Sequence, residues 1–378
     1  MSRLDELIAE LCPDGVEYVS IGSIVNYEQP SKYIVTSTNY NDDFSIPVLT
    51  AGQSFILGYT NETENLYKAS KQNPVIIFDD FTGAFKWVDF PFKVKSSAMK
   101  MLTADTEKTT LRFIFHMMGN IGFTSNEHKR LWISTYSTIS IPLPPLPVQS
   151  EIVRILDNFT ELTAELTAEL TARKKQYEYY KHHLLTDDEN IVTLGHVASY
   201  AKGRISASEV DSTSYVGVDN LLQNCAGKVD SSHVPTENNL TAYKPGDIMI
   251  GNIRPYLKKI WFADNFGGTN GDVLTIRLNE KSAILPKYLY YVLSSDEFFV
   301  YDMNNSKGAK MPRGNKEAVM RYQFAAPSVE KQKKIIGILD RFDTLCNDIS
   351  TGLPAEIAAR QKQYEYYRDK LLTFKELS

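Results

Sequence analysis

The chain has 378 residues, 43% of them hydrophobic, and a formal net charge of −5 at pH 7. This length predicts more than one domain, and the absence of a signal peptide or a long apolar run excludes the secreted and membrane-spanning classes, so a cytoplasmic protein is expected. The three cysteines, Cys12, Cys225 and Cys346, are too widely spaced to indicate a zinc site or a disulfide framework.

Residues 1 to about 142 are expected to form an α/β domain. Short β-rich runs alternate with Gly, Asn and Asp turns, at Ile46–Thr50, Val75–Phe78, Phe90–Val94 and Thr138–Ile141. A helix is expected over Thr109–Gly119. The proline-rich run Pro142–Pro147 should stop any regular element and lead stiffly into the next helix.

A long helix is expected from Val148 to about Leu185, because apolar residues recur there at spacings of three and four. At 1.5 Å per residue it would be roughly 55 Å long, which favours a coiled-coil partner. It contains three perfect tetrapeptides, Glu161–Ala164, Glu165–Ala168 and Glu169–Ala172. They form either a solvated spacer helix or a molecular ruler in which each tetrapeptide adds about 6 Å and about 40° of rotation.

Residues 187 to about 326 are expected to form a second α/β domain. Its opening run, Val192–Ala198, echoes Val19–Val25 near the start of the first domain. Tyr243–Asn252 has the pattern of a turn that leads into a buried strand, and helices are expected at Pro286–Leu293 and Asp296–Tyr301.

A second long helix is expected from about Ser328 to Thr373. Its apolar face begins at Ile335 and recurs at helical spacing to Ile349. Gly352-Leu353-Pro354 then interrupts the pattern, so a kink or a break is expected there.

Two stretches of the chain are nearly repeated. Arg173–Tyr180 matches Arg360–Tyr367, and upstream of each copy Gln149–Phe159 matches Gln332–Phe342. The chain is therefore a tandem duplication. Its second copy carries four extra residues between its two matched motifs, so the repeat is not exact.

The predicted fold class is α/β with two different domains on a duplicated frame. The domains cover 1–143 and 187–327, and two long antiparallel coiled-coil helices cover 144–186 and 328–378. Two such units related by a pseudo-twofold axis would bring the chain termini close together.

Motifs of catalysis and of metal or phosphate binding are not persuasive in this sequence. Asn73-Pro74-Val75-Ile76 lacks the second proline and the aromatic residue of the amino-methyltransferase motif. Asp79 and Asp80 could suggest a metal site, but neighbouring residues of a strand point to opposite faces, and a turn is the preferred interpretation. The glycine-rich run Phe266–Asp272 lacks the Lys-Ser/Thr ending of a phosphate loop. No catalytic or metal-binding residue is predicted.

Several loops suit contact with a polyanion, although the net charge alone leans against nucleic acid. Lys and Arg neutralise phosphates, and Arg, Asn and Gln can pair with base edges. The candidate DNA-binding residues are Gln53, Lys86, Lys95, Ser97 and Lys100 in the first domain and Asn252, Arg254, Tyr256, Lys258, Lys307, Lys310, Arg313 and Lys316 in the second. For any single loop, a solvated basic surface is the default interpretation.

The repeated Gln…Ile-Leu-Asp…Gln-Tyr-Glu-Tyr-Tyr motifs resemble the specificity subunit of type I restriction–modification systems, and the Thr-Ala-Glu-Leu run resembles its IC subgroup. The resemblance covers essentially the whole chain. It implies a non-catalytic subunit in which each variable domain reads one half of a split, asymmetric site on double-stranded DNA. The two long helices would set the spacer between the half-sites.

The resemblance also implies partners. Two methyltransferase subunits, which carry S-adenosylmethionine, would dock on the repeated helical motifs, and the expected contacts are Gln176, Tyr177, Tyr180, Gln363, Tyr364 and Tyr367. Restriction subunits, which use ATP and Mg²⁺, would join the full complex. The alternatives are a self-contained DNA methyltransferase or nuclease, and a coiled-coil assembly hub that binds only protein.

Overall fold

The computed structural model describes residues 2–50, 54–123, 130–348 and 350–377, and the chain divides into two compact units. Unit 1 contains Met1–Glu165 and Ala358–Ser378, and unit 2 contains Leu166–Ile357. Both connections between the units are helical, because α3 (Leu146–Thr186) and α9 (Leu353–Leu371) each contribute residues to both.

Unit 1 is built around an antiparallel four-stranded sheet with the order β2-β8-β5-β6. A three-stranded sheet, β4-β3-β7, and an antiparallel pair, β1 with β9, belong to the same unit. Its elements are α1 (Arg3–Leu11), β1 (Glu17–Ser20), β2 (Val25–Glu28), β3 (Ile46–Leu49), β4 (Ile56–Thr60), β5 (Val75–Asp79), β6 (Phe85–Val88), β7 (Lys93–Val94), β8 (Met99–Ala104), α2 (Leu111–Ile121) and β9 (Ser140–Leu143).

The central strand β5 is buried on both faces, which explains its continuous apolar sequence. Successive side chains of a strand point to opposite faces. Ile76 and Phe78 accordingly pack in the cluster that includes α2 and α3, whereas Val75 and Ile77 pack in a second cluster with residues of the smaller sheet. The four-stranded sheet thus lies between a helical layer and a second sheet.

Unit 2 repeats this plan with a four-stranded antiparallel sheet of the order β11-β18-β15-β16 and a second sheet of the order β12-β14-β17-β13. Its elements are β10 (Ile191–Thr193), α4 (Leu194–Val197), β11 (Ala198–Tyr200), β12 (Arg204–Ser206), β13 (Tyr215–Val216), β14 (Asn239–Tyr243), β15 (Ile248–Gly251), β16 (Ile260–Phe262), β17 (Gly267–Thr269), β18 (Val273–Leu278), α5 (Pro286–Leu293), α6 (Asp296–Asn304), α7 (Lys316–Met320), β19 (Gln323–Ala325) and α8 (Val329–Asn347).

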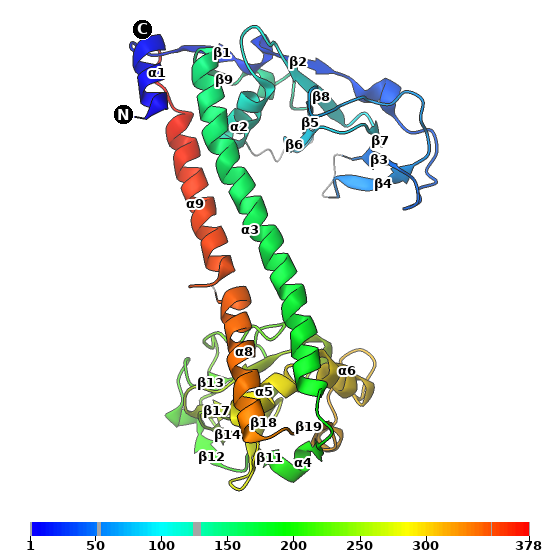
Figure 1. The fold of residues 1–378 in the computed structure, drawn as a ribbon, viewed down its shortest axis with the longest axis vertical. Coiled ribbons are helices and arrows are strands. Elements are labelled where there is room, and N and C mark those ends of the chain that lie inside the picture. Colours follow the sequence, from blue (N-terminus) through cyan, green and yellow to red (C-terminus); the bar gives the residue numbers. More distant parts are fainter. Residues whose placement is uncertain (1, 51–53, 124–129, 349, 378) are drawn as a thin grey trace. The chain divides into compact units, whose positions relative to one another are not determined.

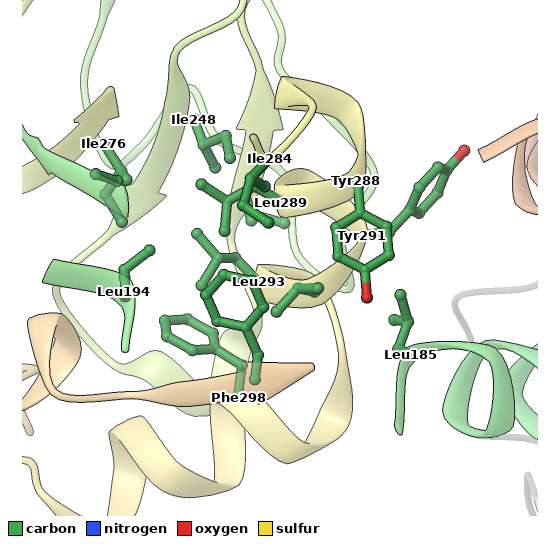
Figure 2. Packing of buried hydrophobic residues seen from close by; sticks show 14 of the residues in the cluster. Leu185, Leu194, Ile248, Ile276, Ile284, Tyr288, Leu289, Tyr291, Leu293 and Phe298 are labelled. Atoms are coloured by element: carbon green, nitrogen blue, oxygen red, sulfur yellow. The ribbon is translucent and has the colours of Figure 1, made fainter. Parts of the chain in front are cut away.

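Figure 2 shows the main core of unit 2, where α5 covers one face of the four-stranded sheet. Ile248 and Ile276 of the sheet pack in one cluster with Tyr288 and Leu289 of α5, and Leu185 at the end of α3 belongs to the same cluster. The helix pair and the domain of unit 2 therefore share a core.

The two domains open in the same way, as their echoing sequences predicted. β1 pairs with β9 and β10 pairs with β19, so in each domain the first strand lies against the last. A Cβ at Gly22 would stand 3.1 Å from the carbonyl oxygen of Ser137, and one at Gly195 would stand 3.1 Å from that of Met320. Close backbone approach therefore favours glycine at this point of both openings.

The helical predictions are confirmed in outline, with one correction at the proline run. Helix α3 begins inside that run, at Leu146, and β9 includes Pro142. The run was expected to exclude regular structure, but proline is tolerated in edge strands and in the first turn of a helix, where Pro147 lies.

The second long helix is broken, as Gly352 and Pro354 predicted. Helix α8 ends at Asn347, and α9 begins at Leu353. A side chain at Gly352 would collide with the carbonyl oxygen of Thr344, and Pro354 falls in the first turn of α9, where its missing N–H group costs nothing.

The chain ends meet in unit 1, which confirms the expectation drawn from the duplication. The N–H group of Val16 donates to the carbonyl oxygen of Lys375 over 2.9 Å, and that of Leu377 donates to Val16 over 2.9 Å. Within unit 1, α9 runs antiparallel to α3 and returns the chain to its start (Figure 1).

Unit 2 is one continuous segment, so we expect a fragment of residues 166–357 to fold alone. Its three hydrophobic clusters lie entirely within those residues. Circular dichroism should give a single cooperative thermal transition. The matched fragment 1–165 lacks Leu372 and the segment 375–377 that forms backbone hydrogen bonds with Val16, so it should melt without cooperativity. If both fragments melted with the same cooperativity, the division of the chain into these two units would be wrong.

Candidate nucleic-acid interface

Two of the loops selected from the sequence lie together in unit 2. The N–H group of Arg254 donates to the carbonyl oxygen of Pro312 over 2.7 Å, and that of Gly314 donates to Asn252 over 3.0 Å. Ile253 and Arg313 also form a β-bridge. We call residues 252–258 and 305–316 the paired loops, because backbone hydrogen bonds make them one structure.

The first of the paired loops has an unusual backbone. Arg254 (φ 54°) and Lys258 (φ 50°) both adopt the left-handed conformation and flank a 3-10 turn, Pro255–Leu257. Each left-handed non-glycine residue costs on the order of 1–3 kcal/mol, and such residues persist only where the surroundings hold them. The N–H group of Asn224 donates to Leu257 over 2.9 Å, which helps to fix the turn.

The paired loops expose a group of cations. Arg254, Lys307, Lys310, Arg313 and Lys316 are exposed, and the side chain of Tyr256 is 50% exposed among them. Of these cations, Arg313 forms an ion pair with Asp272 at 2.7 Å. Lys258 contributes less to the surface charge, because its ammonium group pairs with Asp296 at 2.6 Å.

Asn252 does not belong to this surface. It is 5% exposed, and its side chain lies beneath the paired loops. The expectation that it contacts DNA is therefore corrected: Asn252 directly follows β15, and its side-chain oxygen is buried against Gly314.

The residues selected in unit 1 do not form one surface. Lys86 is exposed on β6, Ser97 is exposed between β7 and β8, and Lys95 is half-buried with its ammonium group 5.8 Å from the ring of Tyr40. Gln53 lies outside the described residues. The candidate set of unit 1 therefore offers no cluster comparable with the paired loops.

Lys100 is a buried structural residue, which corrects its selection as a DNA contact. Its side chain is 1% exposed, and Nζ lies 3.0 Å from Oδ2 of Asp80. The two groups form an ion pair but not a hydrogen bond. Neither atom has a hydrogen-bond partner among the described residues. The other oxygen of Asp80 accepts from the N–H group of Trp132 over 2.9 Å.

Replacing Lys100 with Met should lower the free energy of unfolding by about 3–5 kcal/mol, because it leaves the Asp80 carboxylate buried without a counter-ion. Urea unfolding followed by tryptophan fluorescence would measure the loss. The double variant Asp80→Asn/Lys100→Met removes both charges and should recover most of the stability. A double variant no more stable than the single one would show that the pair is not the cause.

The register of the sheets reveals residues of unit 1 that sequence reasoning missed. Strand β5 occupies the place of β15, so Asp80 stands where Asn252 stands in unit 2. The N–H group of Leu131 donates to the carbonyl oxygen of Asp80 over 2.7 Å, as Gly314 does to Asn252. The counterpart of the paired loops thus includes two exposed residues, Phe81 and Arg130.

One glutamine in each copy of the duplicated motif links a domain to its long helix. The side-chain oxygen of Gln149 accepts from the N–H group of Thr110 over 3.1 Å, and that of Gln332 accepts from Leu285 over 2.8 Å. Each amide nitrogen also donates to the carbonyl oxygen five residues earlier, over 2.8 Å in both copies. The repeated sequence therefore performs the same structural task twice.

A repeated aspartate adds a second link between helix and domain. Asp157 on α3 accepts from Arg112 and His116 on α2, each over 2.8 Å. Burial acts to raise the pKa of Asp157, but hydrogen bonds from His116 and Arg112 outweigh it and hold the pKa below its usual value. In unit 2, Asp340 accepts from the hydroxyl group of Tyr291.

The repeated motifs pair across the two copies rather than within one copy. In unit 1, Phe159 of the first copy stacks on Tyr367 of the second, with ring centroids 5.3 Å apart. In unit 2, Phe342 of the second copy stacks on Tyr180 of the first, at 5.8 Å. Each unit therefore combines one motif from each copy, and both copies are required to build either unit.

This pairing corrects the selection of Tyr177 as a partner contact. Tyr177 is 7% exposed and stacks on Phe342, and burial raises its pKa. Its counterpart Tyr364 is partly buried and lies over His116, with the Tyr364 hydroxyl 3.3 Å from Nδ1 of the imidazole. These first tyrosines of the motif hold the helices to the domains.

Tyr179 and Tyr366 are the most exposed tyrosines of the motif, at 61% each, and the predicted contact Tyr180 is 41% exposed. Tyr179 and Tyr366 occupy equivalent positions in the two copies and were missed because the sequence alone did not separate outward from inward tyrosines. Gln176 and Gln363 are partly buried and accept from arginines three residues earlier, over 3.0 and 3.1 Å.

The described residues contain no group of three or more His, Cys, Asp or Glu side chains arranged to hold a metal ion. None of the helices in the described ranges combines the length and apolar character needed to cross a membrane.

A family model described as the type I restriction modification DNA specificity domain matches the chain twice, over residues 13–173 and 187–359. The chain is 41% identical to the type I restriction enzyme EcoR124I/EcoR124II specificity subunit of Escherichia coli, over 99% of this chain and 97% of that protein. It is 30% identical to a putative type I restriction enzyme specificity subunit of Haemophilus influenzae, over 85% of this chain and 86% of that protein.

Two solved structures have a similar fold. The type I restriction–modification S subunit from M. genitalium covers 95% of this chain and 96% of its own, with a TM-score of 0.61 and 14% identity. A chain from a study of complex assembly and conformational transition of the type I R-M system covers 96% of this chain and 98% of its own, with a TM-score of 0.55 and 15% identity.

Proposed function

Because this chain belongs to the family of type I restriction–modification specificity subunits, we propose that it reads a bipartite, asymmetric site on double-stranded DNA for a complex whose catalysis lies in other subunits. The domains at 1–143 and 187–327 would each read one half-site. One observation carries this proposal: the two domains share a sheet order but expose different residues beside equivalent strand ends, Phe81 and Arg130 in one and Arg254 and Tyr256 in the other.

The physics of DNA recognition supports this division. Readers on one face of a duplex must lie about one helical turn, or roughly 34–36 Å, apart. Two unlike readers specify an asymmetric site, whereas identical readers related by a twofold axis specify a palindrome. In unit 2 the paired loops supply cations for phosphates and Arg254 for a base edge.

The partner subunits are the second part of the proposal. Two methyltransferase subunits, which would bring S-adenosylmethionine, dock on the helices near Tyr179 and Tyr366. Both tyrosines are largely exposed on the duplicated motif, and exposed tyrosine is enriched in protein interfaces. Restriction subunits with ATP and Mg²⁺ complete the restriction complex.

Methylome sequencing of a strain that carries this chain with its methyltransferase partner tests the reading function. We expect one asymmetric motif made of two half-sites and a fixed spacer. The purified chain alone should neither methylate nor cut DNA, and activity of the isolated chain would favour the self-contained enzyme. Binding without any sequence preference in the assembled complex would favour the protein-only hub.

Replacing Tyr179 or Tyr366 with Ala should each remove about one methyltransferase subunit from the complex, because each change truncates one of two equivalent contacts. Native mass spectrometry would count the subunits. Ile191→Ala, which truncates an exposed apolar side chain outside both motifs, serves as the control. If neither tyrosine variant changes the count, the docking surface lies elsewhere on the helices.

A further inference from the structure

A cluster of oxygen atoms without hydrogen-bond partners lies beneath the paired loops. Asp302 is fully buried on α6, and Asn252 is 5% exposed. Both carboxylate oxygens of Asp302 and Oδ1 of Asn252 lack a hydrogen-bond partner among the described residues. A Cβ at Gly314 would stand 2.7 Å from Oδ1 of Asn252 and 2.7 Å from Oδ1 of Asp302. The three oxygens therefore converge on one glycine.

Three acceptors without a donor are unfavourable in a buried site, so a donor must be supplied. Burial raises the pKa of Asp302 to about 6, so the carboxyl group is still mostly ionised at pH 7–8 and can only accept. The amide of Asn252 carries the missing donor. Turning it by 180° about its Cβ–Cγ bond puts Nδ2 in the place of Oδ1, and its N–H groups then face the carboxylate.

The position of the cluster links it to the reading surface. Asn252 begins the first of the paired loops, and Gly314 lies in the second, two residues before Lys316. The backbone of Gly314 already donates to the carbonyl oxygen of Asn252. A side chain at Gly314 would fill the space between the amide and the carboxylate, which accounts for glycine at this position.

We propose that Asn252 donates a hydrogen bond to Asp302 across Gly314, and that this amide–carboxylate pair is a positioning device that holds the paired loops in their reading conformation. The inference rests on the proposed function of the second domain as a half-site reader. Neither residue touches DNA, and both act through Arg254 and the other exposed residues of the paired loops.

Unit 1 has a different pair of buried side chains at the equivalent position. Asp80 stands at the place of Asn252, and Lys100 supplies the opposite charge beside it. A change in the Asn252–Asp302 pair should therefore affect the second half-site and leave reading of the first unchanged. That difference provides an internal control within each binding experiment.

The test is an exchange of the two side chains in the complex assembled with its methyltransferase partner. Asn252→Asp sets two carboxylates against each other and should weaken binding to the second half-site by about 10–100-fold. Asp302→Asn keeps an acceptor and should stay within about threefold of wild type. The double variant Asn252→Asp/Asp302→Asn restores the pair in reverse and should recover binding to within about threefold.

A direct base contact by Asn252, or a cation bound by the three oxygens, would give a different pattern on the same duplexes. If Asn252 contacted a base directly, the double variant would stay as weak as Asn252→Asp. If a cation held the three oxygens, Asn252→Asp would be tolerated, Asp302→Asn would be weak, and EDTA would weaken wild-type binding. Either pattern overturns the inference.

The test also separates this inference from the proposed function. The replacement Arg254→Asn removes a reading side chain and does not touch the buried pair. If Arg254→Asn weakens second half-site binding while the double variant fails to recover it, only the positioning device is wrong. If Arg254→Asn and the variants of the buried pair all leave binding unchanged, the reading surface itself is misassigned.

Discussion

Deleting Glu165–Ala168 is expected to shorten the recognised spacer while both half-sites keep their bases. The division between the units falls within the tetrapeptide run, between Glu165 and Leu166, and α3 is continuous there. Loss of four helical residues shortens the connection by about 6 Å and turns it by about 40°. DNA rises about 3.4 Å per base pair, so the spacer should shrink by about one to two base pairs.

The second connection can adapt to this change. Helix α9 is separated from α8 by the break around Gly352, so the two helices opposite α3 are not one rigid rod. Methylome sequencing of the deletion strain would read the new motif, and methylation at the original site should be lost. The length-preserving control Glu165→Ala/Thr167→Ala should keep the original spacer. Altered half-site bases, or an unaltered spacer, would refute the ruler.

Much of the frame was predictable because its signals are local. The long helices repeat apolar residues over many turns, and Gly352 with Pro354 marks the break within about one helical turn of where α8 ends. The central strands β5 and β15 are continuous apolar runs because both of their faces are buried. The meeting of the chain ends was predicted from the duplication. The first copy is followed by the opening strand of the second domain, and the counterpart of that strand after the second copy is the N-terminal segment.

The reading surface was only partly predictable, because burial of a polar side chain depends on distant partners. Lys100 and Lys86 are both lysines on strands of one sheet, yet only Lys100 meets a buried carboxylate. Asn252 follows a strand as a surface residue would, but its amide is buried against Gly314. Local sequence carries no signal for either outcome.

The helix motif illustrates the same limit. Tyr177 and Tyr179 belong to one short motif, and helical spacing alone does not show which of them faces a domain. The structure separates them because each motif pairs with the other copy, so Tyr177 is buried against Phe342 and Tyr179 remains exposed. A repeated motif invites the assumption that each copy packs on itself, and the packing of both units contradicts that assumption.

Removing the guanidinium group of Arg254 is expected to weaken the second half-site alone. The replacement Arg254→Asn suits this test, because asparagine tolerates the left-handed backbone that Arg254 adopts, so the paired loops should keep their shape. A side chain that pairs with a base edge contributes about 1–3 kcal/mol of discrimination, which corresponds to roughly 5–150-fold in affinity. The motif should relax at one position of that half-site.

Lys310→Ala gives the contrasting result, since a flexible exposed lysine on the same loops neutralises phosphate without reading bases. Its loss should weaken binding to all sequences alike and reduce the slope of log affinity against log salt by about one. Lys281 follows the end of β18 opposite to Asp272, away from the paired loops, so Lys281→Ala is the matched control and should change neither quantity.

Fluorescence anisotropy at several salt concentrations measures both effects on duplexes that carry the native or a substituted half-site. If Arg254→Asn and Lys310→Ala have the same effect on every sequence, the paired loops bind the DNA backbone, and the bases of the second half-site are read by other residues of unit 2.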